Sequence, residues 1–394
     1  MRKNKRVLFL GNLAVAYNRD VLRGVAEFAG RHPEIRVFFP DNFEPADLPA
    51  LIRGDIHGVI VAGCPPAWKL SEAIAIRGVP AVDVSAELEM SSLPRVVTDD
   101  AAVGRMAADY FIDRGFRRLV YYGMSQRYWS DARLDGFIAQ AAARGAAAQY
   151  FRKQEAEAED RAGLYPSTAA RWLKHLATPA AIYAGDDLLG AYLVEACRNL
   201  KIRVPEDIAI LGTDNDDLYG QLRTPHLSSI LLDSRNIGLR SMELLYRRMR
   251  GKKIKAMTVL IPPIRVITRL SSDIFGVEDD LVRDALGLIQ QNLSGVSVKW
   301  LADQLAVSRP TMERHFLAAL NRTPATEIQR IQMETARQLV LDSDMPIAQV
   351  AQKSGYSSPR QFSTSFHNYF NETPRNMRKT HRYAAAASPD SGTR

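Results

Sequence analysis

The chain has 394 residues, of which 46% are hydrophobic and 24% are charged, and this composition favours two or three globular domains over a disordered or fibrous chain. A formal net charge of +8 at pH 7 favours anionic partners. Only two cysteines are present, Cys64 and Cys197, with no C-x-x-C pair, which argues against a disulfide framework or a zinc site and fits a reducing cytoplasm.

The first residues are basic and then apolar, as in a signal peptide. Asn12 interrupts the apolar run, and the residues after it are typical of a helix rather than of a cleavage site. No apolar run reaches the roughly 18 residues that a membrane-spanning helix needs. We therefore expect a cytoplasmic protein that does not enter a membrane.

From residue 6 onward, short β-rich runs alternate with amphipathic helices, such as those predicted over 19–32, 101–115 and 186–200. This alternation predicts parallel sheets that are covered by helices on both faces. The number of repeats predicts two doubly wound α/β lobes within residues 1–270. The predicted strands are 6–11, 36–40, 58–63, 80–85, 95–99, 118–123, 180–185 and 208–214.

Ligands of such folds bind beyond the carboxyl ends of the strands, so the polar residues that follow each strand are candidates for a binding site. Carboxylates accept hydrogen bonds from vicinal hydroxyls, arginine donates in a fork, and an aromatic ring covers an apolar C–H face, so the set favours a polyhydroxylated ligand. Asp99 and Asp187 also fit helix caps, and Trp129 also fits a core. The candidate ligand-binding residues are Tyr17, Asn18, Asp99, Trp129, Arg133, Asp186 and Asp214.

Residues 271–279 (SSDIFGVED) are short, polar and contain a glycine, which predicts a linker to a second domain over 280–383. In that domain a pattern of two helices and a turn occurs twice, at 297–320 and 346–370. We expect the last residues, 384–394, to form a disordered tail.

The two copies carry the same helix signals. Ser308 and Ser358 stand at N-cap positions, and Asn321 and Asn371 stand where a helix stops in the left-handed conformation, each followed by Thr-Pro. Short amphipathic helices also occur in bundles that bind no DNA, but a duplicated helix-turn-helix with matched caps and stops predicts DNA binding.

A helix predicted over 326–343 separates the two copies, with Ile328, Ile331, Ala336 and Val340 at helical spacing. About 17 residues give a helix of about 25 Å. Two recognition helices on one face of DNA need centres about 34 Å apart, so one chain can read two successive major grooves.

The residues near the start of each second helix are the candidates for base contacts, since arginine reads guanine, glutamine reads adenine and glutamate reads cytosine. Residues 280–383 hold 13 Lys and Arg against 9 Asp and Glu, a balance of 13 − 9 = +4 that suits double-stranded DNA. The candidate DNA-binding residues are Arg309, Thr311, Glu313 and Arg314 in the first copy and Arg360, Gln361, Ser363 and Thr364 in the second.

The stretch GYSSPRQFSTSFHNYFNETP (355–374) resembles the hallmark of the AraC family of bacterial transcription regulators. Asn371 stands where the family usually has glycine, and His367 where it usually has a basic residue. The resemblance implies a regulator with two helix-turn-helix motifs that binds as a homodimer, activates its genes, and has RNA polymerase as a further partner.

Residues 6–270 resemble the LacI-type and periplasmic sugar-binding fold in the stretches VVTDDAAVGRMAADYFIDRGFRRLVYYG, ARLDGF, YAGDDLLGAYL and IAILGTDND. The resemblance implies that Asp99, Arg133, Asp186 and Asp214 line a sugar site. Leu232 stands where that family often has glutamine, which bears on the choice of sugar.

A sugar-binding domain before an AraC-type domain is an unusual order, and it resembles the xylose-responsive members of the AraC family, in stretches such as AYNRDVLRGV and IPPIRVITRLSSD. The resemblance implies D-xylose as the effector, no cofactor, and a cytoplasmic, nucleoid-associated protein. Another pentose or hexose remains an alternative, as does a DNA-binding protein that responds to no ligand. A sugar-processing enzyme is a further alternative. The sequence contains no G-x-S-x-G motif, no phosphate loop and no H-E-x-x-H motif, which argues against it.

Overall fold

The computed structural model divides into two compact units, one with residues 1–112 and 116–274 and the other with 113–115 and 275–394. The division at 274/275 lies within the segment 271–279. Of the predicted tail, only residues 384 and 385 are described. The structure describes residues 4–40, 50–51, 55–62, 74, 78–87, 93–153, 167–221, 224–252, 254, 257–277 and 279–385.

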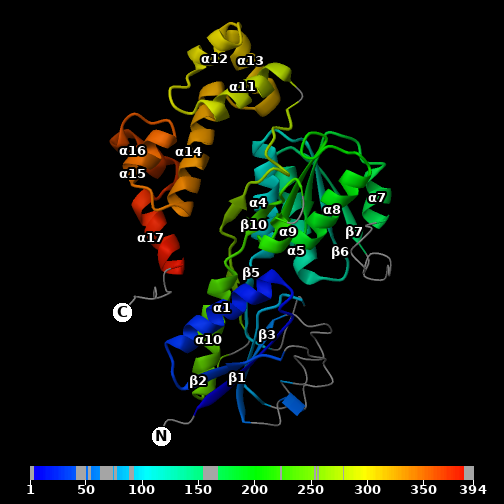
Figure 1. The fold of residues 1–394 in the computed structure, drawn as a ribbon, viewed down its shortest axis with the longest axis vertical. Coiled ribbons are helices and arrows are strands. Elements are labelled where there is room, and N and C mark those ends of the chain that lie inside the picture. Colours follow the sequence, from blue (N-terminus) through cyan, green and yellow to red (C-terminus); the bar gives the residue numbers. More distant parts are fainter. Residues whose placement is uncertain are drawn as a thin grey trace. The chain divides into compact units, whose positions relative to one another are not determined.

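The first lobe of the larger unit is built on a six-stranded sheet with the order β11-β5-β4-β3-β1-β2, in which every pair is parallel. Helices α1 (Ala16–Gly30) and α10 (Ser234–Met249) pack side by side on one face of this sheet (Figure 1). The strands are β1 (Lys5–Gly11), β2 (Ile35–Phe38), β3 (Ile56–Ala62), β4 (Ala81–Asp83), β5 (Arg95–Thr98) and β11 (Thr258–Ile261).

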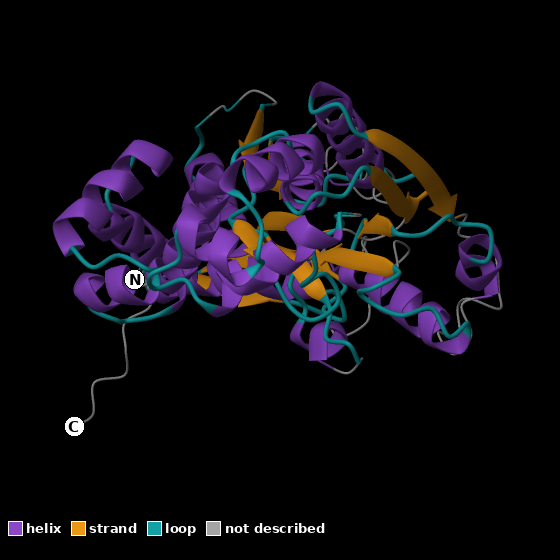
Figure 2. Ribbon diagram, turned by 90° about the horizontal axis from the view of Figure 1, so that it is seen from above, coloured by secondary structure: helices purple, strands orange, loops and turns teal. Residues whose placement is uncertain are grey.

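The second lobe is built on another six-stranded sheet with the order β12-β10-β9-β8-β6-β7, in which only β12 runs antiparallel. Helices α4 (Asp100–Asp113) and α5 (Tyr128–Ala143) cover one face, and α7 (Ser167–Leu173) and α8 (Asp187–Asn199) cover the other, so that strands lie between helices (Figure 2). The strands are β6 (Arg118–Met124), β7 (Ala147–Lys153), β8 (Ala180–Ala184), β9 (Ile208–Thr213), β10 (Ser228–Leu231) and β12 (Arg265–Ile267), and a short helix α9 (Asp217–Gln221) follows β9.

The chain passes between the two lobes three times: from β5 to α4, from β10 to α10, and from β11 to β12. The first passage contains Asp99 and leads directly to Asp100, the first residue of α4, and the second contains Leu232. Because the passages lie at the ends of strands, the polar residues predicted for the ligand site collect at the junction of the lobes.

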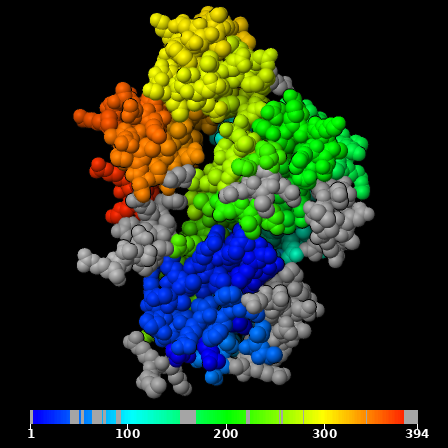
Figure 3. Space-filling view, in the orientation of Figure 1, coloured from blue at the N-terminus to red at the C-terminus, as the bar shows by residue number. Residues whose placement is uncertain are grey.

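The smaller unit is helical, and its long central helix α14 (Pro324–Asp342) contributes to two separate cores. Ile328 and Ile331 pack in the first core, and Met333, Ala336 and Val340 pack in the second. Figure 3 shows the first helix-turn-helix in yellow and the second in orange as adjoining masses. The other helices are α11 (Asp280–Gln291), α12 (Val298–Gln304), α13 (Arg309–Leu320), α15 (Ile347–Lys353), α16 (Pro359–Phe370) and α17 (Pro374–Ala385). Among the helices of the described ranges, none combines the length and the apolar character that crossing a membrane requires.

The predicted helix signals are confirmed. The Ser308 hydroxyl accepts from the backbone N–H of Thr311 at 3.2 Å, and the Ser358 hydroxyl accepts from that of Gln361 at 3.4 Å. Asn321 and Asn371 adopt the left-handed conformation with φ of 56° and 55°.

All eight predicted strands are confirmed with ends within two residues, but the sequence analysis missed β7, β10, β11 and β12. Strands β10, β11 and β12 have three or four residues each, and β7 is an edge strand, so their hydrophobic patterns are short or mixed.

Candidate functional site

Arg133 is the centre of the polar group at the junction of the lobes. Its side chain is buried, and its Nε donates to Asp100 Oδ1 at 2.8 Å while Nη1 donates to the Gly185 carbonyl at 2.5 Å. The guanidinium carbon lies 4.9 Å from the centroid of the Trp129 ring. A buried guanidinium with these partners is held in one orientation, and the aromatic ring beside it stays half-exposed.

The pairing of Asp100 with Arg133 depends on two glycines, where α4 and α5 cross. A Cβ atom on Gly104 would lie 2.0 Å from the Arg133 carbonyl oxygen, and one on Gly136 would lie 2.1 Å from the Ala101 carbonyl oxygen. Only glycine allows helices to approach this closely. The short crossing distance brings the first turn of α4 against the side chain of Arg133.

Three further candidates carry carboxyl groups at this junction. Asp214 follows β9 with a φ of 101°, a conformation uncommon for a residue with a side chain. Burial raises the pKa of Asp214 to about 7 against the influence of Arg133, and the Asp186 and Asp100 carboxylates add to the rise. Asp186 is the N-cap of α8 and accepts from the backbone N–H of Leu189 at 2.7 Å. Asp99 accepts from the backbone N–H of Ala102 at 2.9 Å, in the cap role that the sequence left open.

Tyr17 and Asn18 also lie at the junction, but protein groups occupy polar atoms of both. The Tyr17 hydroxyl donates to the Val84 carbonyl at 2.6 Å, and its ring packs against the cores of both lobes. Burial raises the pKa of Tyr17, and the Asp100 carboxylate adds to the rise. The Asn18 amide donates to the Asn12 carbonyl at 3.0 Å and is buried, so it holds the turn after β1.

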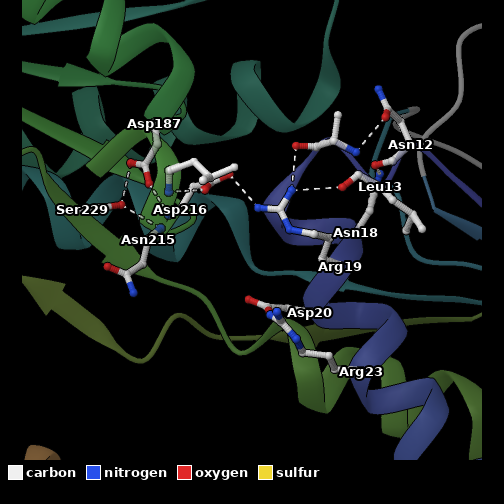
Figure 4. A network of polar contacts seen from close by, with 12 residues as sticks. Asn12, Leu13, Asn18, Arg19, Asp20, Arg23, Asp187, Asn215, Asp216 and Ser229 are labelled. Carbon is white, nitrogen blue, oxygen red and sulfur yellow. Dashed lines mark hydrogen bonds and ion pairs between the residues drawn. The ribbon is translucent and has the colours of Figure 1, made fainter. Parts of the chain in front are cut away.

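The sequence analysis missed the role of Asp187. Its buried carboxylate accepts from the Ser229 hydroxyl at 2.6 Å and from the backbone N–H of Asp216 at 2.7 Å (Figure 4). A Cβ atom on Gly212 would lie 2.1 Å from Asp187 Oδ1, which explains the glycine in β9. Asp187 therefore fixes the turn that presents Asp214. The two hydrogen-bond partners lie 29 and 42 positions from Asp187 along the chain, and no local motif connects them.

The sequence analysis also did not predict the role of Asp100, because no sequence signal shows its pairing with Arg133, 33 positions away. Burial raises the pKa of Asp100, and the Arg133 guanidinium opposes the rise. Leu232, which the sequence analysis connected with the choice of sugar, is buried in the apolar core of the second lobe.

The two recognition helices, α13 and α16, each bury one face and present the other. Met312 and Phe316 in α13 are buried, and Arg314, about 200° around the helix from Met312, is exposed. Phe362 in α16 is buried in the same way, and Arg360 is exposed. Both arginines are therefore on the exposed side of their helices.

Three DNA-binding candidates of the first helix-turn-helix already have partners in their helix or at its N-cap. Arg309 Nε donates to Glu313 Oε1 at 2.8 Å, so these two candidates form one unit. The Thr311 hydroxyl lies 2.8 Å from that of the N-cap Ser308.

In the second helix-turn-helix, the Ser363 and Thr364 hydroxyls donate to the backbone carbonyls one turn earlier in α16, at 2.9 Å and 3.2 Å. A base contact from either as donor requires a hydroxyl rotation. Gln361 is exposed on the same helix.

Comparisons with known proteins agree with this organisation. Residues 108–272 match the family model of a periplasmic binding protein-like domain, and residues 301–380 match that of a helix-turn-helix domain. The chain is 26% identical to the xylose operon regulatory protein of Haemophilus influenzae, over 95% of this chain and 98% of that protein. It is 27% identical to the protein of that name in Escherichia coli K12, over 95% of this chain and 97% of the relative.

Among solved structures, a xylose-binding transcription activator matches with a TM-score of 0.60 at 25% identity, over 95% of this chain and 98% of that one. These relatives are transcription regulators, which sets aside the alternative of a sugar-processing enzyme. The chain is thus a DNA-binding transcription regulator that resembles the xylose operon regulators along almost its whole length, with a periplasmic-binding-protein-like domain before an AraC-type helix-turn-helix domain.

Proposed function

We propose that this regulator binds a neutral sugar between the lobes of its larger unit, and that the buried Arg133 is the principal donor to that sugar. The observation that carries the proposal is the arrangement of Arg133 between Asp100 and the Trp129 ring, with the Asp186 and Asp214 carboxyl groups close by. An aromatic face, one arginine and several acceptors together suit a ring with many hydroxyls.

The charge at this site favours a neutral ligand over a sugar phosphate. The carboxylates of Asp186 and Asp100 both act on the Asp214 carboxyl group, beside the Arg133 guanidinium. A phosphate group would bring two further negative charges into a partly desolvated, carboxylate-rich site, which is unfavourable.

D-xylose is the proposed effector, since the relatives that the chain resembles along almost its whole length are named for xylose. Sugar binding would act by shifting the equilibrium between lobe arrangements, through different affinities for the two forms. We propose that the protein works as a homodimer in the cytoplasm, associated with the nucleoid, and activates sugar-catabolic genes together with RNA polymerase.

The helical unit would bind operator DNA with both recognition helices. Arg314 and Arg360 are proposed as base-reading residues because they are exposed opposite the buried faces of α13 and α16. The Arg309–Glu313 unit, Gln361 and the hydroxyls of Thr311, Ser363 and Thr364 are proposed as neighbouring contacts. The 19 residues of α14 form a helix of about 28 Å that separates the two helix-turn-helix motifs.

A thermal-shift titration of the full-length protein tests the effector. We expect a saturable rise in Tm with D-xylose and none with L-arabinose, D-ribose, D-glucose or D-ribose 5-phosphate, because a ligand at 100 times its Kd adds about 2.7 kcal/mol to the folded state. Arg133→Lys should abolish the rise, and the matched control Arg144→Gln, which removes an exposed ion pair with Asp109 within one lobe, should keep it. A rise with another sugar alone would replace the effector, and no rise with any sugar would leave a DNA-binding protein that responds to no sugar in this set.

A further inference from the structure

Two ion pairs connect the first lobe to the second at the edge where the strands end. Arg19 on α1 donates from Nη2 to Asp216 Oδ2, after β9, at 3.0 Å. Arg127, just before α5, donates from Nη1 to Glu87 Oε2, after β4, at 2.7 Å. In each pair one partner belongs to the first lobe and the other to the second.

The two pairs lie at different places along the junction. Strand β3 separates β1 from β4 in the first sheet, and β8 separates β9 from β6 in the second. Two strand spacings correspond to about 10 Å. Two contacts at this separation hold one lobe against the other in translation and in rotation, which a single contact does not.

The Arg19–Asp216 pair is also joined to the turn that presents Asp214. Arg19 Nη1 donates to the carbonyls of Leu13 and Ala14 at 3.0 Å and 2.8 Å, so the arginine is anchored in the turn after β1 (Figure 4). On the other side, the backbone N–H of Asp216 donates to Asp187, which fixes the turn. The pair therefore connects the two loops that flank the proposed sugar site.

The side chains of both pairs are largely withdrawn from solvent, with exposed fractions of 28% and 4% for Arg19 and Asp216 and of 20% and 17% for Arg127 and Glu87. When the lobes separate, each pair must break, because its members belong to different lobes. We propose that these two pairs, which we call the closure contacts, form when the lobes come together and thereby set the affinity for the effector. The inference rests on the proposed sugar-sensing function.

The expected effect follows from the population of the closed form. Observed affinity is the intrinsic affinity multiplied by the fraction of molecules in the binding-competent form, so weaker closure lowers the affinity without removing a ligand contact. Partly buried ion pairs of this geometry should change affinity by about 3- to 10-fold each.

A double-mutant cycle tests each closure contact in the full-length protein. Isothermal titration with D-xylose would compare the wild type with Glu87→Gln, Arg127→Gln and the double variant, and likewise with Arg19→Gln, Asp216→Asn and their combination. Within each cycle we expect every single variant to bind about 3- to 10-fold more weakly and the double variant to bind no more weakly than the singles. The exchanged pair Glu87→Arg with Arg127→Glu should recover most of the affinity, and Arg144→Gln should have no effect.

The dependence of xylose affinity on ionic strength is a second test. If the closure contacts only supported the fold, removing them would not change this salt dependence. Raising NaCl from about 0.05 M to about 0.5 M shortens the screening length from more than 10 Å to less than 5 Å. We expect xylose affinity to fall with salt in the wild type and to fall less in a quadruple variant that lacks both pairs.

A distance measurement tests closure without relying on sugar binding. Spin labels at two exposed positions, Ala26→Cys in α1 and Ala139→Cys in α5, report the separation of the lobes in a Cys64→Ser background. Cys197 is buried and should not be labelled. Distances would be measured by double electron–electron resonance with and without D-xylose. We expect Glu87→Gln with Asp216→Asn to lengthen or broaden the distribution in at least one of the two conditions.

The outcomes separate the two proposals. If D-xylose does not bind to the wild type but the distribution responds to the variants, the effector is wrong and the closure contacts stand. If D-xylose binds and the variants change neither affinity nor distance, the closure contacts are wrong and the effector stands. A loss of affinity with unchanged distances in both conditions would assign these charges to direct ligand contact and also overturn the inference. If neither sugar nor variant has any effect, both proposals fail.

Discussion

Asp214 gives the proposed sugar site a pH dependence of its own. Its pKa of about 7 means that the carboxyl group is protonated below pH 7 and ionised above it. A carboxylate accepts from two sugar hydroxyls, and a protonated carboxyl must first release its proton to do so. Sugar and proton therefore compete, and affinity for D-xylose should fall as the pH decreases through 7.

The expected size follows from that single titration: affinity should be about ten-fold lower at pH 6 than at pH 8, and nearly constant above pH 8. Isothermal titration across this range measures it. Asp214→Asn removes the titrating group, so the variant should bind more weakly but with a flat profile. A wild-type profile that runs parallel to that of Asp214→Asn would contradict the assignment.

Arg314 and Arg360 should each determine much of the base preference of their recognition helix. Replacing Arg314 or Arg360 with alanine should weaken operator binding by about 1–3 kcal/mol and relax the preference at one base pair, because each can make a bidentate contact with guanine. Fluorescence anisotropy on operators with single base-pair changes measures both effects. An equal loss on random DNA would instead make that arginine a phosphate contact.

At the scale of helices, the close crossing of α4 and α5 positions Arg133 in the proposed sugar site. Gly104→Ala places a Cβ where the Arg133 carbonyl oxygen now lies 2.0 Å away, so the helices must separate. We expect the larger unit to lose about 3 kcal/mol of unfolding free energy and D-xylose binding to disappear, as followed by chemical denaturation and titration.

A glycine with open surroundings provides the control for that substitution. Apart from its chain neighbours and the nearby backbone of its own helix, no heavy atom lies within 4 Å of the Cβ that Gly287→Ala would add in α11. This change should therefore leave sugar binding intact and stabilise its helix by about 0.5–1 kcal/mol. Equal behaviour of the two alanine variants would show that the close crossing is not what orients Arg133.

At the scale of the whole molecule, one side chain connects the sugar site with the segment that leads toward the helical unit. Arg269 donates to Asn215 Oδ1 at 2.7 Å and to the Leu227 carbonyl at 2.8 Å, and Asn215 directly follows Asp214. Arg269 stands five residues before Ile274, the last residue of the larger unit. A change at the Asp214 turn therefore has a direct connection to this segment.

Arg269→Gln should accordingly uncouple D-xylose binding from operator binding. We expect D-xylose affinity to change by less than about 3-fold, while the ratio of operator affinities with and without sugar moves toward one, since allosteric coupling is a free energy between the two sites. Anisotropy titrations of operator DNA at zero and saturating D-xylose measure the ratio. Arg118→Gln, which removes contacts to the Ala177 and Pro179 carbonyls within one lobe, is the control. An unchanged ratio in Arg269→Gln would exclude this connection.

The sequence by itself determined the elements whose signals are local. The caps Ser308 and Ser358, the stops Asn321 and Asn371 and the strands with continuous apolar runs were predictable, because neighbours within a few residues decide them. The short strands β10 to β12 were not, since their pairing with distant strands rather than their own pattern makes them strands.

The tertiary structure decided how the site is arranged. The sequence shows carboxylates after strands. Only the crossing at Gly104 and Gly136 pairs Asp100 with Arg133, and only the folded sheet places Asp187 under the turn of Asp214. The Arg19–Asp216 pair joins residues 197 positions apart. Local propensities act over one or two turns of chain, whereas ion pairs, raised pKa values and contacts between lobes depend on which distant residues the packing brings within a few ångströms.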